Sequence, residues 1–273
     1  MSDKISIVGI QTTLTKGKKD NLDRALGIME SALKLHKHVD MVVLPENFCF
    51  FPAKGEAEYI GAIPDDFIKV FSEYAKTYNT YITAGSITNR REGRLYNTSL
   101  LFDRRGNIAG SYDKVHLFDA LNAGAEDKES NMITAGDRLL IHDGDFGRIG
   151  TMICYDIRFP EMARTLALSG VQYLFVPAAF YMPRFDHWQT LIKTAALQNS
   201  MYVAGANLFG KFGNTSGFCG RSLIADPWGI ALAVSSDKAG FIQAYVDGDY
   251  CNEIRDAVGS FHNRVPSVYN MPR

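Results

Sequence analysis

Short apolar runs and amphipathic stretches alternate along most of this chain. Residues 4–11 (KISIVGIQ), 40–46 (DMVVLPE) and 173–180 (YLFVPAAF) are rich in β-branched and aromatic side chains, which predicts buried strands. Between the first two, apolar residues recur at helical spacing over 21–38, and Asp20 is the predicted N-cap of that helix. This alternation predicts a protein of mixed α and β structure.

The pattern continues toward the C-terminal end. Pro64, followed by two aspartates, is typical of the first turn of a helix. Turns at 104–107 and inside 139–156 predict two β-hairpins. The remaining predicted elements are helices over 64–78, 160–170 and 187–200, and strands over 81–87, 95–103, 202–209, 220–227 and 241–247.

The two halves of the chain repeat one arrangement. Each contains a strand–helix–strand unit whose second strand ends near a proline, at Pro45 and Pro177. No segment rich in proline, glycine and serine separates the halves. We therefore expect one domain over 1–273, built from two packed sheets with helices outside.

Composition and charge exclude several classes of partner. The 273 residues are 46% hydrophobic and 22% charged, as in ordinary globular proteins. The formal net charge of -1 gives no reason to expect electrostatic capture of nucleic acid or an anionic membrane. The first residues do not resemble a signal peptide, and no apolar stretch approaches the ~20 residues of a spanning helix. We expect a cytoplasmic protein.

Several familiar motifs are missing from the sequence. The glycines of "GDFGRIG" (144–150) lack dinucleotide-binding spacing and precede a predicted strand, so they indicate a hairpin turn. The sequence has no GxxxxGK[ST], HExxH, EF-hand or GxSxG pattern. The four cysteines are scattered without a CxxC pair and are expected to be free thiols. Nucleotide hydrolysis, metalloprotease and ordinary serine-hydrolase chemistry are therefore not indicated.

Three reactive side chains come at the ends of predicted strands. Glu46 follows "VVLP", Lys114 lies in "YDKVHLF", and Cys154 follows "GTMI". We expect the three to meet at one edge of a sheet. A carboxylate can take the thiol proton and return it to a leaving amine, and an ammonium can stabilise the oxyanion of a tetrahedral intermediate. Such a set can attack a carbonyl or nitrile carbon without a histidine base.

These stretches resemble the nitrilase superfamily of carbon–nitrogen hydrolases over nearly the whole chain. Glu46 in "LPENF", Lys114 in "DKVHLFD" and Cys154 in "GTMICYDIRFPE" match the order and context of that family's Glu-Lys-Cys triad. The family's second glutamate, thought to orient the lysine, matches Glu129 in "ESNMITAG", with Glu126 as the alternative.

The resemblance also implies substrate contacts. Tyr155 would supply a backbone N–H to the oxyanion. The segment after "LFVPAAF" lines the acyl pocket in the family, which implies roles for Phe180, Tyr181 and Met182. Further candidates in the neighbouring stretches are Arg158, Arg184, His187 and Trp188.

Simpler structural roles compete for several of these residues. Phe185 and Trp188 suit core aromatics as well as pocket walls. Glu161 suits the first turn of a helix, where a carboxylate interacts favourably with the helix dipole. His116 and Asp156 are expected to support the site rather than react. Cys49, Cys219 and Cys251 are expected to be structural.

The resemblance implies an α-β-β-α sandwich of two mixed sheets, a homodimer, and no metal or organic cofactor. The tail over 256–273 is the part expected at the dimer interface. "HLFD" and "CYDIRFPE" most resemble the ω-amidase and deaminated-glutathione amidase branch. That branch implies hydrolysis of a small carboxamide, through a thioester, to an acid and ammonia. Arg158 or Arg184 would then hold a substrate carboxylate.

Other functions remain open at this point. The loop over 120–128 departs from the ω-amidase pattern, so the rim of the pocket and its substrate are expected to differ. An N-carbamoyl amidohydrolase would use the same triad. A nitrilase is less favoured, because nitrilases carry tryptophan where Tyr155 stands. A non-catalytic scaffold is disfavoured by the intact triad.

Overall fold

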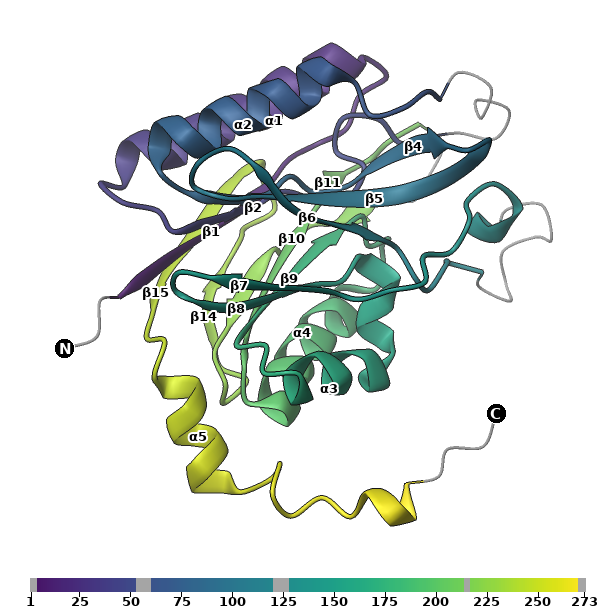
Figure 1. Ribbon diagram of the computed structural model, residues 1–273. Coiled ribbons are helices and arrows are strands. Elements are labelled where there is room, and N and C mark those ends of the chain that lie inside the picture. Colours follow the sequence, from purple (N-terminus) through teal and green to yellow (C-terminus); the bar gives the residue numbers. More distant parts are fainter. Residues whose placement is uncertain (1–3, 53–59, 120–127, 214–216, 270–273) are drawn as a thin grey trace.

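Two β-sheets lie face to face, and a pair of helices covers the outer face of each (Figure 1). This computed structural model describes residues 4–52, 60–119, 128–213 and 217–269. The arrangement confirms the predicted α-β-β-α sandwich. The outer helices are α1 (Lys18–Leu35) and α2 (Asp65–Tyr78) on one side, and α3 (Pro160–Leu168) and α4 (Phe185–Asn199) on the other.

The first sheet mixes parallel and antiparallel pairs. Its strand order is β15-β1-β2-β3-β5-β4, and β6 pairs with β5 as well. β1, β2 and β3 are parallel, whereas β15, β4, β5 and β6 join through antiparallel pairs. The strands are β1 (Ile5–Gln11), β2 (Met41–Val43), β3 (Tyr81–Thr83), β4 (Ile87–Arg91), β5 (Arg94–Phe102), β6 (Ile108–Asp113) and β15 (Gly240–Val246).

The second sheet has the order β14-β13-β10-β9-β8-β7. Its centre is parallel, and hairpins close both edges. The predicted hairpin turn at 144–150 is confirmed, because β7 and β8 pair across it. The strands are β7 (Leu140–Gly144), β8 (Gly147–Thr151), β9 (Tyr173–Ala178), β10 (Tyr202–Asn207), β13 (Leu223–Ala225) and β14 (Ala231–Val234), and a separate ribbon pairs β11 (Phe209–Gly210) with β12 (Phe218–Cys219).

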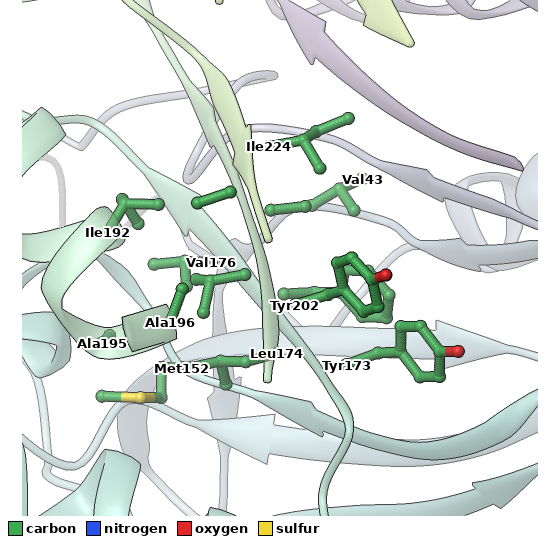
Figure 2. Close-up of a cluster of buried hydrophobic side chains, with 14 of the residues drawn as sticks. Val43, Met152, Tyr173, Leu174, Val176, Ile192, Ala195, Ala196, Tyr202 and Ile224 are labelled. Carbon is green, nitrogen blue, oxygen red and sulfur yellow. The ribbon is translucent and has the colours of Figure 1, made fainter. Parts of the chain in front are cut away.

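Alternation along each strand builds two apolar layers. Ile7 and Val43 point into the layer between the sheets, whereas their neighbours Val8 and Val42 point toward α1 and α2. In the second sheet, Figure 2 shows Val176 directed toward Ile192 of α4. Because both faces of each sheet are covered, the central strands are apolar throughout.

Most predicted helix boundaries are within two residues of those observed, and two larger differences concern the first helix and the C-terminal end. The first helix begins at Lys18 with Gly17 as its N-cap, so Asp20 lies in its first turn and does not cap it. A fifth helix, α5 (Tyr250–Val258), was not predicted. It is followed by a short turn, η5 (Pro266–Val268), and this end of the chain runs past α3 and α4 at the periphery (Figure 1). No helix in the described ranges has the length and apolar character needed to cross a membrane.

Candidate active site

A cavity of about 660 Å³ opens where strand ends of the two sheets meet. Glu46, Lys114, Glu129 and Cys154 all face it, so the structure brings together the four predicted catalytic residues. Much of its remaining wall is apolar. Other wall residues include Phe51, Thr88, Phe118, Met132, Ile133 and Ala179.

The three reactive groups do not share one sheet edge, so that detail of the prediction was wrong. Glu46 lies three residues after β2, and Lys114 directly follows β6, both in the first sheet. Cys154 begins a short 3-10 helix, η4 (Cys154–Arg158), just after β8 of the second sheet. The site is therefore assembled across the interface between the sheets.

Glu46 is 3% exposed, and both of its carboxylate oxygens are hydrogen-bonded. Oε1 accepts from Lys114 Nζ at 3.0 Å and from Asn97 Nδ2 at 2.8 Å. Oε2 accepts from the backbone N–H of Ala179 at 2.9 Å. The donors come from both sheets, since Ala179 directly follows β9. A buried carboxylate is tolerated here because its oxygens are so well supplied with donors.

Lys114 is 2% exposed and lies between two carboxylates. Its Nζ donates to Glu46, and to Glu129 Oε2 at 2.9 Å. Burial by itself lowers the pKa of the Lys114 ammonium, but the charges of Glu46 and Glu129 outweigh it and raise the pKa well above the usual value. Lys114 is therefore a permanent cation at neutral pH.

Glu129 is held in position by a short helical turn and by a hydrogen bond from the backbone of Phe118. It begins η3 (Glu129–Asn131), and its Oε2 accepts the Phe118 N–H at 2.7 Å. This geometry favours Glu129 as the second glutamate. The alternative, Glu126, lies outside the described residues, as does most of the loop over 120–128.

Cys154 has an unusual backbone and an unusual thiol. Its φ is 48°, in the left-handed region that non-glycine residues rarely adopt. Burial raises the pKa of the thiol well above its usual value, and the charge of Glu46 raises it further. Lys114 and the Ala179 N–H act in the opposite direction but do not cancel this rise. The resting site therefore favours a neutral thiol beside a carboxylate that can accept its proton.

Asp156 holds the turn that carries Cys154. Its carboxylate is fully buried and accepts from the Ile153 N–H at 2.9 Å and from the Tyr112 hydroxyl at 2.6 Å. It also accepts the His116 N–H at 2.8 Å, and His116 Nδ1 lies 2.8 Å away. Tyr112 and His116 flank Lys114 in the sequence, so Asp156 ties the cysteine turn to the lysine strand. The expected supporting roles of His116 and Asp156 agree with these contacts.

Known proteins identify the family. The carbon–nitrogen hydrolase family model matches residues 4–256. The chain belongs to the carbon–nitrogen hydrolase family. It is 34% identical to the omega-amidase NIT2-A of Xenopus laevis, covering 98% of this chain and 97% of that protein. It is also 34% identical to a deaminated glutathione amidase of Synechocystis, covering 94% and 96%.

A solved structure extends the likeness to the fold. The crystal structure of Saccharomyces cerevisiae Nit3, a member of the nitrilase superfamily, superposes with a TM-score of 0.84 at 27% identity. It covers 93% of this chain and 94% of that chain. The predicted resemblance to the nitrilase superfamily is confirmed, and the chain is a hydrolase of carbon–nitrogen bonds.

Most of the predicted substrate contacts of this hydrolase line the cavity. Tyr155, Phe180 and Tyr181 form an aromatic side, on which Tyr155 packs edge-on against Phe118 at 5.1 Å between ring centroids. Burial raises the pKa of the Tyr181 hydroxyl, and the charge of Glu46 adds to the rise. Tyr181 is therefore a neutral hydroxyl close to the reactive groups. The oxyanion role of the Tyr155 N–H stays a prediction.

Two arginines complete the wall of the hydrolase cavity. The Arg158 guanidinium lies over the Phe180 ring at 5.1 Å, and that of Arg184 over the Phe118 ring at 6.0 Å. Burial lowers the pKa of Arg158, and the positive charge of Arg184 lowers it further against an opposing contribution from Tyr155. The two cations are therefore near enough to repel each other.

Three predicted contacts are not among the residues that line the cavity. Met182 packs against the hydrophobic core, and His187 is exposed, with its Nδ1 lying 3.3 Å from the Arg158 guanidinium. Trp188 is fully buried, and its indole N–H donates to the Arg221 carbonyl at 2.9 Å. Phe185 likewise packs on the core. The face of α4 that carries Phe185 and Trp188 is directed toward the core, so both are core aromatics and not walls of the cavity.

Two residues of the site, Asn97 and Lys128, were not predicted from the sequence. Asn97 lies on β5 and contacts Glu46, whereas Lys128 lines the cavity beside Glu129. The stretch "YNTS" around Asn97 has the pattern of an ordinary strand. Its contact with Glu46 depends on how β5 is aligned with the neighbouring strands, which the sequence alone does not show. Among the described residues, no group of three or more histidine, cysteine or acidic side chains is arranged to hold a metal.

Proposed function

We propose that this hydrolase cleaves a small carboxamide that carries a carboxylate, and releases ammonia and the corresponding acid through a thioester on Cys154. The observation that carries the proposal is the buried contact of Lys114 with Glu46 and Glu129 beside a neutral Cys154 thiol. A site with this set can donate a proton, accept a proton and stabilise an anion without a cofactor.

The first half of the reaction forms the thioester. Glu46 takes the thiol proton while Cys154 Sγ attacks the amide carbon, and the carbonyl oxygen becomes an oxyanion. The Lys114 ammonium and the Tyr155 N–H stabilise that oxyanion. The C–N bond then breaks, and Glu46 returns its proton to the nitrogen, which leaves as ammonia.

The second half restores the enzyme. Glu46 takes a proton from water, the hydroxide oxygen attacks the thioester carbon, and the C–S bond breaks. The thiolate recovers a proton and the acid leaves, so one amide and one water give one acid and one ammonia. Glu129 keeps Lys114 in place through both halves.

The substrate class rests on the two arginines. Within the described part of the chain, neither Arg158 nor Arg184 is paired with a carboxylate, although both line an otherwise largely apolar cavity. An anionic substrate group would relieve their mutual repulsion and could bind either guanidinium through two parallel hydrogen bonds. The ω-amide of an α-keto acid fits this description, in agreement with the similarity to an omega-amidase.

Ammonia release from a panel of amides tests this proposal, with wild type, Cys154→Ala and Cys251→Ala compared. Cys251 is a buried cysteine on α5 and serves as the matched control. We expect turnover of carboxylate-bearing ω-amides by wild type and Cys251→Ala, and a loss of about 10⁴-fold or more in Cys154→Ala. Activity that survives in Cys154→Ala would contradict the mechanism.

The same panel separates the other chemistries. Turnover of N-carbamoyl compounds alone, with release of carbon dioxide, would support the proposed catalytic residues but contradict the proposed substrate class. Turnover of nitriles alone would do the same. If no compound is hydrolysed and an alkylating agent does not label Cys154 selectively, the scaffold alternative is correct.

We also propose a homodimer in a reducing compartment such as the cytoplasm. Val265, Val268 and Tyr269 are exposed on the tail, which suits burial against a second copy. The mechanism requires Cys154 to remain a free thiol, which favours a reducing compartment. Light scattering of the purified chain is expected to give the mass of two copies, and the mass of one copy would contradict the dimer.

A further inference from the structure

Asn97 is a buried polar residue beside the reactive groups to which neither the sequence analysis nor the proposed mechanism assigns a role. It is 1% exposed and lies on β5, which is paired at this end with β4 on one side and β6 on the other. Its backbone carbonyl accepts the Lys114 N–H at 2.9 Å. Because strands hold both sides of β5, the position of the Asn97 side chain is fixed to within a rotamer.

The Asn97 side chain makes the two oxygens of Glu46 unequal. Oε1 accepts from two donors, Asn97 Nδ2 at 2.8 Å and Lys114 Nζ at 3.0 Å. Oε2 accepts from one donor, the Ala179 N–H. Each carboxylate oxygen has about two lone-pair positions, so Oε1 is saturated while Oε2 retains one. Oε2 is therefore the oxygen free to accept the Cys154 proton.

We propose that Asn97 is a positioning residue that holds the Glu46 carboxylate with Oε2 directed at Cys154. The inference rests on the proposed function, because it concerns the base of that mechanism. Asn97 acts by saturating Oε1, which prevents the carboxylate from rotating and exchanging its two oxygens. The amide of Asn97 touches neither substrate nor reacting atom.

An amide suits this position better than any charged group. A second ammonium would compete with Lys114 for Oε1, and a carboxylate would repel Glu46. The orientation of the amide is set by the same contact, because turning it over would place Oδ1 against Oε1. In the described structure Oδ1 has no hydrogen-bond partner, so the Nδ2 contact with Glu46 is the interaction that fixes this side chain.

The test compares Asn97→Ala and Asn97→Asp with wild type over pH 5–9, and Asn89→Ala is the matched control. Asn89 is also 1% exposed, lies on the neighbouring strand β4 and donates to Thr98 at 2.6 Å, away from Glu46. Rates are divided by the concentration of folded protein, measured as the fraction that elutes as a single species in size-exclusion chromatography, so that misfolded protein is not counted.

A positioning role predicts a particular order of activities. Asn97→Ala is expected to lower kcat about 10²-fold with KM changed less than about threefold, because the base is misplaced and not the substrate. Asn97→Asp is expected to be about tenfold worse again at pH 8, where two carboxylates face each other. It should recover toward pH 5, where the introduced carboxyl is protonated and can donate to Glu46. Asn89→Ala should keep kcat within about twofold.

The charged and titratable groups around Glu46 are Lys114, Glu129, Cys154 and Tyr181, and all four stay in every variant. A shift of the pH profile that appears only in Asn97→Asp is therefore due to the introduced carboxyl. A purely structural role predicts the reverse order, with the isosteric Asn97→Asp more active than Asn97→Ala and its pH profile unchanged.

That reverse order would overturn the inference, and so would full activity in Asn97→Ala. Both results require that wild type turns over an amide. If wild type itself is inactive on every amide, the proposed function fails instead, so the two failures are distinguishable.

Discussion

Two regions of the cavity are built on different principles. We call the buried reactive groups around Glu46 and Lys114 the floor, and the side formed by Arg158 and Arg184 the wall. On the floor, Glu46 and Lys114 are at most 3% exposed, and hydrogen bonds of 2.8–3.2 Å to named atoms hold them. On the wall, Arg158 and Arg184 are only partly buried and contact the faces of aromatic rings at 5.1 and 6.0 Å. The floor holds its side chains in one orientation through hydrogen bonds, whereas the wall supplies positive charges whose orientation is less constrained.

The difference matches what each region has to do. Proton transfer requires donor and acceptor to be aligned within a fraction of an ångström, so its residues lie on strand ends and short turns. Substrate capture tolerates more freedom, since a guanidinium over a ring can still turn toward a carboxylate. Changes to the floor should therefore affect stability and kcat, and changes to the wall should affect KM for charged substrates.

The largest effect is expected for Lys114→Met. It removes the cation between Glu46 and Glu129 and leaves two carboxylates facing each other in a buried site. Breaking a buried ion pair from one side lowers the unfolding free energy by about 3–5 kcal/mol, and activity should be lost as well. Chemical denaturation and ammonia release measure the two effects. Lys19→Met, which breaks an exposed pair with Asp23, should leave stability unchanged.

The pH dependence of this effect has a defined sign. The pKa of Lys114 is raised above its usual 10.5 in the folded protein. The folded state therefore binds this proton more tightly, and the stabilisation is fully present below pH 10.5 and declines as pH rises through the folded-state value. The difference in stability between wild type and Lys114→Met should thus be constant between pH 7 and 9. A difference that disappears in this range would show that Lys114 is not held as a cation.

A smaller effect is expected for Asp156→Asn, which keeps the shape of the side chain and removes its charge. The amide cannot accept from all the donors that now surround the carboxylate, so the unfolding free energy should fall by about 2 kcal/mol. We also expect kcat to fall about tenfold, because the Cys154 turn loses its link to the Lys114 strand. Asp237→Asn, in an exposed pair with Arg221, is the control. An unchanged kcat would show that Asp156 does not help to position the reactive groups of the floor.

The narrowest effect, confined to one substrate class and without loss of stability, is expected for Arg158→Ala and Arg184→Ala. Loss of a charged hydrogen bond should raise KM for a carboxylate-bearing amide about 10- to 100-fold and leave turnover of a neutral amide of the same size unchanged. Arg105→Ala, at an exposed turn, should change neither. Equal losses on both amides would mean that the wall takes part in the chemistry, and the contrast with the floor would disappear.

The sequence predicted the residues of the floor because they are chemically conspicuous. A carboxylate, an ammonium and a thiol each come at the end of a predicted strand, and the pattern of those strands also predicted the two sheets. The sequence did not show that Cys154 comes from the opposite sheet. Strand periodicity gives the face on which a side chain lies but not the sheet to which the strand belongs.

Supporting residues were harder to predict, for a related reason. Asn97 and Asp156 act through the atoms they contact, and those contacts depend on strand register and on the fold of η4. Met182 and Trp188 show the opposite error. Both follow the strand whose end lines the cavity, but the rotation of α4 directs Trp188 into the core. Local pattern does not encode such rotations.

The left-handed backbone of Cys154 has a consequence for the stability of the turn that carries it. At φ 48° a glycine would be free of strain, whereas any other residue carries a cost of order 1 kcal/mol. For folding alone, glycine would be the less strained residue at this position. The backbone of this turn is therefore shaped for the reaction and not for stability, and the strain at Cys154 is part of what the fold gives up to present its thiol.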